Sequence, residues 1–375
     1  MRVLHTSDWH LGRAFHRESL IGAQAAFVDH LIETVRSERV DVVAVAGDVY
    51  DRALPSVDAV ALCNDALGRL KDEGVRSILI SGNHDSARRL GFGADLIDAS
   101  GVHLRTDPAR VGEPVVVGDV AFYGIPYLEP EVVRTPWELA ERSHTAALQH
   151  AMGLIRADLS RRGTRAVVLA HAFVTGGESS DSERDISVGG VSHVPVSAFD
   201  GVDYVALGHL HGRQRMSESV RYSGSPIAYS FSEERQLKGS WLVDIGAQGF
   251  ASAEFVPAPV PRPIAKIAGR LDALLTSDAW ARHEDHWLHV TLTDPQRPKA
   301  AMERLRQRFP HTLALAFEPE GGPEAVPETP RFEGRPEIDV ALDFVRAVRG
   351  EPADADEKRL LQTAVEACRL KEALV

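Results

Sequence analysis

Five short clusters of aspartate, asparagine and histidine constrain this chain more than any other feature, because each directly follows an apolar run of strand length. The clusters are Asp8-Trp9-His10, Gly47-Asp48-Val49-Tyr50-Asp51, Gly82-Asn83-His84-Asp85, Ala170-His171 and Gly208-His209-Leu210-His211. In open α/β sheets, ligands bind in the crevice beyond the carboxyl ends of the strands. We therefore expect the five clusters to meet at one place and to form a metal site.

The side chains in these clusters that could bind a metal offer oxygen and nitrogen atoms and no thiolate. Such a mixed set suits Mn²⁺ or Fe²⁺, tolerates Zn²⁺ and argues against a structural zinc site. Two ions about 3.5–4 Å apart stabilise the attacking and the leaving oxygens of a phosphate ester together. The clusters therefore indicate two-metal hydrolysis of a phosphate ester, with at least one carboxylate bridging the ions.

Several neighbours of the expected ligands have simpler predicted roles. Asp85 is predicted to cap the helix that follows it. Gly47, Gly82 and Gly208 are predicted to permit tight turns and a close approach of the backbone.

Strand and helix patterns alternate along the first part of the chain, which is typical of an α/β domain. Strands are expected at 1–6, 40–46 and 75–81, and helices at 20–35, 55–74 and 87–99. Further strands are expected at 115–117, 120–123, 165–170 and 202–207, a long helix at 136–161, and meander strands at 213–217, 220–223, 239–245 and 251–256. Layered together, these elements predict a two-sheet α/β sandwich with helices outside.

Two linkers divide the rest of the chain. The proline-rich segment 257–263 is predicted to be stiff and extended, and a strand-helix-strand-helix-strand unit follows it. Two amphipathic helices come after a second linker at 318–330, and their apolar faces must be covered by this chain or by a partner. We expect three regions, at 1–257, 264–318 and 331–375.

Composition sets weaker limits on function. Two cysteines, Cys63 and Cys368, are too few for a disulfide framework, and both are predicted to be buried thiols. The start of the chain does not resemble a signal peptide and no apolar run is long enough to span a membrane, so we expect a cytoplasmic protein. The net charge of −12 does not exclude nucleic acid, because bound cations would change the local charge of the site.

The five clusters resemble those of the calcineurin-like metallophosphoesterases, which share an αββα sandwich. A narrower resemblance, to the SbcD family of nuclease subunits, adds a small α/β capping domain and a C-terminal helix pair. It covers the first 260 or so residues firmly and the remainder by architecture. It rests on Ser182-Glu183-Arg184-Asp185, Val188-Gly189-Gly190, Asp203-Tyr204-Val205-Ala206-Leu207-Gly208-His209-Leu210-His211 and Tyr222-Ser223-Gly224-Ser225-Pro226.

The resemblance implies a role for each residue of the clusters. Asp8, His10 and His211 are expected to hold one metal ion. Asn83, His171 and His209 are expected to hold the other, with Asp48 as the bridge. His84 is expected to be a catalytic residue that is not a ligand and that assists departure of the leaving oxygen, with Asp51 orienting it. The segment 176–190 is expected to be a loop beside the site.

The same resemblance implies a Mn²⁺-dependent DNA nuclease, with 3′→5′ exonuclease action on duplex ends and endonuclease action on single strands or hairpins. It also implies a homodimer that works in DNA repair and recombination with SbcC, an SMC-like coiled-coil ATPase that binds the last two helices. The chain lacks a Gly-x-x-x-x-Gly-Lys-[Ser/Thr] phosphate loop, so dependence on ATP must come from that partner.

Two other functions are compatible with the same clusters. A small-molecule phosphodiesterase or phosphomonoesterase would use the same ligands, but it has no obvious need for a cap and a separate helix pair. A non-catalytic scaffold would have lost ligands, whereas all seven are present together with His84.

Overall fold

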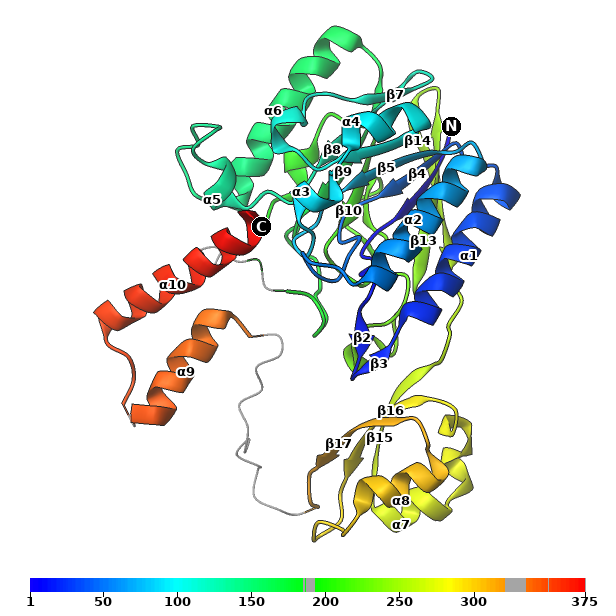
Figure 1. Ribbon diagram of the computed structural model, residues 1–375, viewed down its shortest axis with the longest axis vertical. Coiled ribbons are helices and arrows are strands. Elements are labelled where there is room, and N and C mark those ends of the chain that lie inside the picture. Colours follow the sequence, from blue (N-terminus) through cyan, green and yellow to red (C-terminus); the bar gives the residue numbers. More distant parts are fainter. Residues whose placement is uncertain (185, 187–192, 321–334, 350, 375) are drawn as a thin grey trace.

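A computed structural model describes residues 1–184, 186, 193–320, 335–349 and 351–374. Two six-stranded sheets lie at the centre of the larger part of the protein, and helices cover their outer faces (Figure 1). This is the predicted αββα sandwich with a smaller α/β unit and a C-terminal helix pair. None of the helices among the described residues is both long and apolar enough to cross a membrane.

The first sheet has the strand order β14-β13-β1-β4-β5-β6. Its strands are β1 (Arg2–Thr6), β4 (Val42–Val45), β5 (Arg76–Ile80), β6 (Val102–Arg105), β13 (Gly239–Gly246) and β14 (Gly249–Pro257). Strands β1, β4, β5 and β6 are parallel, while β13 runs antiparallel to β1. The carboxyl ends of β1, β4 and β5 therefore open at one edge of this sheet.

The second sheet has the strand order β11-β12-β10-β9-β8-β7. Its strands are β7 (Val115–Val117), β8 (Val120–Ile125), β9 (Arg165–His171), β10 (Tyr204–Gly208), β11 (Gln214–Arg215) and β12 (Val220–Tyr222). Strands β8, β9, β10 and β12 are parallel. The carboxyl ends of β9 and β10 carry the other two ligand clusters.

Three apolar layers hold the sandwich together. The inner faces of the two sheets form one layer, with Val42 and Ile78 from the first sheet and Val167 and Tyr204 from the second. Helices α1 (Ile21–Glu38) and α2 (Val57–Asp72) cover the outer face of the first sheet. Helix α6 (His144–Arg162) covers the second sheet. Because both faces of the central parallel strands are buried, β1, β4, β5, β9 and β10 are mostly apolar, as parallel sheets require.

Short helices connect these layers. Helices α3 (Ala87–Leu90) and α4 (Ala94–Ile97) replace a single third helix, and Gly93 between them has a φ of 72°. The helix expected at 87–99 is therefore divided into two short ones. A short helix α5 (Pro130–Val133) precedes α6, and a two-stranded ribbon, β2 (Ala14–Phe15) with β3 (Glu18–Ser19), follows the first cluster.

Two sequence predictions of local structure are wrong. The long helix begins at His144 and not at residue 136, because the hydroxyl of Ser143 accepts a hydrogen bond from the backbone N–H of Ala146 and caps it there. The four expected meander strands do not form one meander. Strands β11 and β12 extend the second sheet, with β12 parallel to β10, whereas β13 and β14 form a hairpin beside β1 in the first.

The small unit beyond the proline-rich linker has a parallel sheet of β15 (Ile264–Gly269), β16 (Trp287–Leu292) and β17 (Thr312–Phe317). Helices α7 (Leu271–Thr276) and α8 (Ala301–Arg308) pack on it around Leu274, Leu305 and Phe309. A second apolar cluster joins this unit to the sandwich, because Trp287 packs against Phe15 and Phe231. Within the second predicted linker, residues 321–330 lie outside the described residues.

The chain ends in helices α9 (Glu337–Arg349) and α10 (Ala355–Leu374). They pack against each other, and the guanidinium of Arg142 in the sandwich donates two hydrogen bonds of 2.9 Å to the carboxylate of Glu366. Cys63 is buried in α2 as predicted, but Cys368 is exposed on α10. The prediction for Cys368 is wrong because helix α10 is covered only where it touches α9 and the sandwich.

Candidate metal centre

Loops at the carboxyl ends of β1, β4, β5, β9 and β10 bring all seven expected ligands to one edge of the sandwich. Six of the seven, all except Asn83, are buried. The ligands come from both sheets, so packing of the two sheets is required to assemble the site. The seven residues are Asp8, His10, Asp48, Asn83, His171, His209 and His211.

The first expected ligand set is compact. One ligand atom from each of Asp8, His10 and His211 lies within 4.8 Å of the others. The Nε2 atoms of His10 and His211 are 3.1 Å apart. The Nδ1 atom of His10 is buried and has no hydrogen-bond partner among the described residues.

The second expected set meets around Asn83. Its Oδ1 lies 2.9 Å from Nε2 of His171 and 3.1 Å from Nδ1 of His209. On the opposite side of the His171 ring, Nδ1 lies 2.9 Å from the backbone carbonyl of Ala46. That carbonyl can only accept a hydrogen bond, so it holds the proton of His171 on Nδ1 and leaves Nε2 as a lone pair facing Asn83.

Asp48 lies between the two sets. Its Oδ2 is 3.5 Å from Nε2 of His10 and 3.5 Å from Nε2 of His171. Its Oδ1 accepts a hydrogen bond of 2.8 Å from the backbone N–H of His84. A single carboxylate equidistant from both sets has the position that a bridging ligand requires.

The spacing of these donor atoms fits divalent ions. Ligand atoms at right angles around an octahedral ion with bonds of about 2.1 Å lie about 3 Å apart. The separations of 3.1 Å between His10 and His211, and of 2.9 and 3.1 Å around Asn83, match that spacing. Two nitrogen lone pairs that face each other at such a distance also need a proton or a cation between them. The residues present therefore fit two divalent metal ions.

The backbone at this edge is held in conformations that the sequence pattern does not reveal. Asp8, His10, Asp48 and His209 all have positive φ values, of 52°, 44°, 48° and 107°. Non-glycine residues seldom adopt positive φ, and such strain is concentrated at functional sites. The predicted role of Gly82 fits the structure, because a Cβ atom there would collide with the Asp48 carboxylate.

His84 lies against this cluster. Its Nδ1 is 2.9 Å from the backbone carbonyl of Asp51, so Nδ1–H donates to that carbonyl and Nε2 is directed elsewhere. The Asp51 carboxylate instead lies 3.4 Å from the Arg13 guanidinium and 3.7 Å from Nδ1 of His10. Distances alone also admit His84 as a ligand, because His10, Asp48 and His84 form a compact group.

Burial changes the protonation of the two aspartates. In the absence of a cation, burial raises the pKa of Asp8 to about 6 and that of Asp48 to about 8. Burial lowers the pKa of His10 and His209 well below their usual value, and neighbouring histidines act in the same direction. His10 and His209 are therefore neutral and ready to bind metal, whereas the carboxyl groups must first lose protons. His211 differs, because Glu183 and Glu233 outweigh its burial and raise its pKa above the usual value.

Asp85 does not cap the next helix, and that prediction is wrong. Ser86 caps α3 by accepting a hydrogen bond from Arg89 N–H. The buried Asp85 carboxylate accepts hydrogen bonds of 3.1, 2.8 and 2.9 Å from the backbone N–H groups of Val49, Tyr50 and Gly82. It therefore ties the loop after β4 to the loop after β5, and those two loops carry Asp48 and Asn83.

Tyr229 supports the site and was not predicted from the sequence. Its hydroxyl donates a hydrogen bond to the backbone carbonyl of Trp9. Its ring meets the rings of His10 and His211 edge to face, with centroids 5.3 and 5.5 Å apart. The motif that ends at Pro226 lies just before it and is the nearest signal in the sequence.

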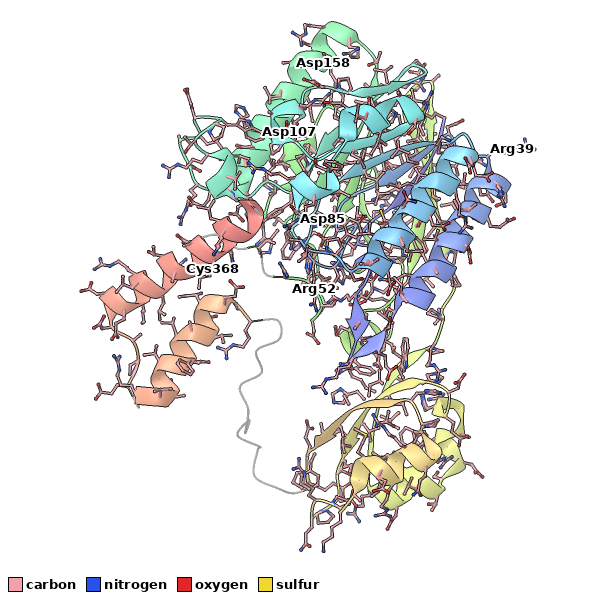
Figure 2. All side chains as sticks on the ribbon, in the orientation of Figure 1. Arg39, Arg52, Asp85, Asp107, Asp158 and Cys368 are labelled. Carbon is pink, nitrogen blue, oxygen red and sulfur yellow. The ribbon has the colours of Figure 1, made fainter. Side chains whose placement is uncertain are left out.

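A large cavity opens beside the cluster. It has a volume of about 1430 Å³, and its lining includes Asn83, His84 and His209. The lining also includes several cationic side chains, which are Arg52, Arg88, Arg184, Arg335, Arg369 and Lys371. Figure 2 labels Arg52 and Asp85 near the sheet edge and Cys368 on α10, and all three line this cavity.

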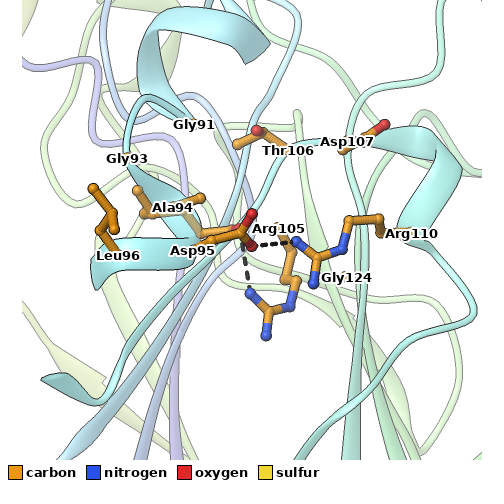
Figure 3. Close-up of a pocket in the computed structure, with 11 residues that line it drawn as sticks. Gly91, Gly93, Ala94, Asp95, Leu96, Arg105, Thr106, Asp107, Arg110 and Gly124 are labelled. Atoms are coloured by element: carbon orange, nitrogen blue, oxygen red, sulfur yellow. Dashed lines mark hydrogen bonds and ion pairs between the residues drawn. The ribbon is translucent and has the colours of Figure 1, made fainter. Parts of the chain in front are cut away.

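A second pocket, of about 520 Å³, lies at α4 and β6 and contains none of the expected ligands (Figure 3). Its cations are neutralised locally. Arg110 donates to the Asp95 carboxylate at 2.7 Å (Figure 3). Arg105 donates to the carboxylate of Asp98, outside the pocket lining, at 2.8 Å. This pocket therefore contains none of the ligands of the expected metal centre.

Residues 1–213 match the family described as calcineurin-like phosphoesterase. That match covers more than half of the chain, and the protein belongs to the calcineurin-like phosphoesterase family. Residues 260–348 match a second family, SbcD_C, described as the type 5 capsule protein repressor C-terminal domain. This pair of domains is consistent with an SbcD-type nuclease subunit.

Three solved structures are similar to this chain at low identity. The protein TT1561 of Thermus thermophilus is 12% identical, with a TM-score of 0.41, over 68% of this chain and 98% of that one. A dimetal phosphatase from Danio rerio is 13% identical, with a TM-score of 0.39, over 69% and 99%. An archaeal phosphodiesterase is 13% identical, with a TM-score of 0.31, over 68% and 100%. The family assignment rests on the two matched domains.

Affinity for Mn²⁺ is expected to increase as pH rises from about 6 to about 8. Asp8 and Asp48 have pKa values of about 6 and about 8 without a cation, so rising pH removes the protons that compete with metal. Calorimetric titration with Mn²⁺ in two buffers of different ionisation enthalpy measures both the affinity and the protons released. An affinity independent of pH, without proton release, would contradict the expected role of Asp48.

Asp85→Ala is expected to lower the free energy of unfolding by about 3 kcal/mol, because buried N–H groups lose their acceptor. Asp85→Asn keeps one acceptor oxygen and should cost less. Urea unfolding of the metal-free protein measures both changes, with Asp72→Ala at the exposed end of α2 as the control. Equal stability of Asp85→Ala and the control would show that the three hydrogen bonds do not stabilise these loops.

Proposed function

We propose that this protein is a Mn²⁺-dependent DNA nuclease that uses two metal ions held by the seven clustered ligands. The observation that carries this proposal is the cavity of about 1430 Å³ beside Asn83, His84 and His209. Pockets for small molecules have volumes of about 300–1,000 Å³. Among the described residues, the lining holds six cationic side chains and five acidic ones, which are Asp85, Asp107, Glu129, Glu183 and Glu337. The size of the cavity, more than its charge, therefore suits a polyanionic chain better than a small phosphate ester.

His84 is the proposed general acid. With Nδ1–H donated to the Asp51 carbonyl, Nε2 remains for the substrate. Burial and the nearby Arg184 guanidinium lower the pKa of His84 well below its usual value. A phosphate anion in the cavity opposes that shift, so His84 gains a proton when substrate binds and donates it from Nε2 to the leaving oxygen.

The other residues of the site hold the metal ions or orient His84. Bound divalent ions would supply an activated water and offset the negative charge that develops on the phosphate. The Asp48 carboxylate lies between the two ligand sets and connects them. Its Oδ1 accepts a hydrogen bond from the backbone N–H of His84 and fixes the position of that residue. Asp51 orients His84 through its main-chain carbonyl, while its carboxylate lies beside His10 and Arg13.

We infer that the C-terminal helices bind an SbcC-type coiled-coil ATPase. The match of residues 260–348 to SbcD_C supports this inference. Helix α10 touches the sandwich through Glu366, yet Phe344 and Val348 on one face of α9 are 66% and 71% exposed, and Leu360 on α10 is 71% exposed. Exposed apolar side chains at spacing i, i+4 are typical of a helix that binds a partner.

A homodimer is proposed for the same assembly. Val57 at the start of α2 and Phe92 and Leu96 around α4 are each more than 80% exposed. Large apolar side chains this exposed on the N-terminal helices support an interface with another chain. In this proposal, the dimer joins two ATPase subunits and works on DNA ends during repair and recombination in the cytoplasm.

His84→Ala is expected to bind Mn²⁺ like the wild type and to cleave DNA about 10²–10⁴-fold more slowly, because a general acid is lost while the ligands remain. Digestion of end-labelled duplex and hairpin DNA with Mn²⁺ measures cleavage, and calorimetry measures the bound metal. His150→Ala is the matched control, since His150 stacks on Trp137 outside the clusters.

Two results would change these assignments. Loss of metal in His84→Ala would make His84 a ligand. A wild-type protein that cleaves a chromogenic bis-phosphoester but no DNA, even with the ATPase and ATP, would be a small-molecule phosphodiesterase.

Phe344→Glu combined with Val348→Glu is expected to abolish binding of an SbcC-type ATPase, because the exposed apolar face of α9 becomes charged. The Mn²⁺ content of the chain should stay the same. Co-purification with the ATPase tests the change, with Arg346→Glu on the same helix as the control for charge. Undiminished binding by the double variant would place the partner elsewhere.

A further inference from the structure

The Nδ1 side of His211 faces a buried chain of hydrogen bonds. The Ser182 hydroxyl lies 2.5 Å from Nδ1 of His211 and donates in turn to Oε1 of Glu233. His211, Ser182 and Glu233 are all buried. Because the hydroxyl proton is used on the carboxylate, Ser182 can only accept from His211, so the imidazole proton lies on Nδ1 and Nε2 faces His10 as a lone pair.

We propose that Ser182 and Glu233 are positioning residues that fix the tautomer and ring orientation of His211 for one of the two metal ions. This inference rests on the proposed two-metal site. Carboxylate groups behind metal-binding histidines serve this purpose in other proteins, and their loss weakens metal binding about 10–100-fold. Here a serine hydroxyl is interposed between the carboxylate and the histidine.

The charge of Glu233 is compensated within the protein. Its Oε2 lies 2.5 Å from the Lys238 ammonium, and both side chains are buried. The ammonium also donates to the backbone carbonyl of His211 at 2.8 Å and to the Ser225 hydroxyl at 3.0 Å. The ion pair of Glu233 and Lys238 therefore holds His211 at two points. Glu233 acts on the ring through Ser182, and Lys238 binds the backbone carbonyl.

The interposed hydroxyl connects the Glu233 carboxylate to the His211 ring. Oε1 of Glu233 is 3.5 Å from Nδ1 of His211, beyond a direct hydrogen bond. Ser182 bridges that gap, because it accepts from Nδ1 and donates to Oε1. Glu233 therefore fixes the position of the ring proton through Ser182, while its other oxygen is paired with Lys238.

The segment that carries Ser182 is itself anchored on the site. Glu183 Oε1 accepts a hydrogen bond of 2.7 Å from the backbone N–H of His211, and its Oε2 accepts from Ser180. The Arg13 guanidinium donates to the backbone carbonyl of Ser182 at 3.0 Å. The motif at 182–185 therefore has a physical role up to Glu183, whereas Asp185 and Val188-Gly189-Gly190 lie outside the described residues.

The test measures metal directly. Ser182→Ala is expected to weaken one of two bound Mn²⁺ ions about 10–100-fold and to leave the other unchanged, with the melting temperature of the metal-free protein preserved. Calorimetric titration with Mn²⁺ gives both affinities, and electron paramagnetic resonance distinguishes a coupled ion pair from a single ion. Ser182→Thr keeps the hydroxyl and should restore both readouts.

Glu233→Gln is expected to weaken binding of the same Mn²⁺ ion. Ser217→Ala is the control, because it removes a half-buried turn hydrogen bond outside this network and should bind both ions like the wild type. Wild-type affinity for both ions in Ser182→Ala would overturn the inference, as would a wild-type chain that binds fewer than two ions. A wild-type chain that binds two ions, loses one in Ser182→Ala and cleaves no DNA would refute only the nuclease proposal.

Discussion

The buried carboxylate of Asp48 is the constraint from which the rest of the site follows. It lies at equal distances from His10, which follows the first sheet, and from His171, which ends a strand of the second. A buried charge without a partner is costly, so this carboxylate must hold a proton or meet cations. Because the two sheets pack face to face, cations bound at their shared edge would satisfy Asp48 and the histidines of both sheets together.

Three histidines of the site share one arrangement. Each of His84, His171 and His211 has one ring nitrogen bound to an acceptor of the protein, either a backbone carbonyl or the Ser182 hydroxyl. The other nitrogen is thereby left without a proton and is aimed at the site. Orientation is thus set by the scaffold before any ion arrives, and the strained backbone of Asp8, Asp48 and His209 is one cost of this arrangement.

Sequence reasoning located the expected ligands because ligand type and strand position are both visible in the chain, as with Asn83 directly after an apolar run. It could not locate Glu233, because this residue is far from Ser182 and His211 in the sequence and reaches them only in the folded chain. No motif around Glu233 indicates a role at a metal site. Asp85 was predicted to be a helix cap because it lies just before α3, where caps occur. The sequence does not show that its carboxylate turns instead to the backbone N–H groups of two neighbouring loops. Sequence reasoning extended α6 too far because the helical pattern before Ser143 gives no sign that the chain there is irregular.

An acidic protein can act on a polyanion when its cations gather where the substrate lies. The chain carries −12 overall, but the cavity beside the metal centre is lined by arginines from several segments, among them Arg52, Arg88 and Arg184. Helix α10 adds Arg369 and Lys371 to the same lining, and Arg369 is paired with Glu337 of α9 at 3.2 Å. The wall of this cavity and the exposed apolar face of α9 are therefore parts of one helix pair, and Glu337 at the start of α9 also lines the cavity. A protein bound on that apolar face would contact a helix that itself lines the cavity.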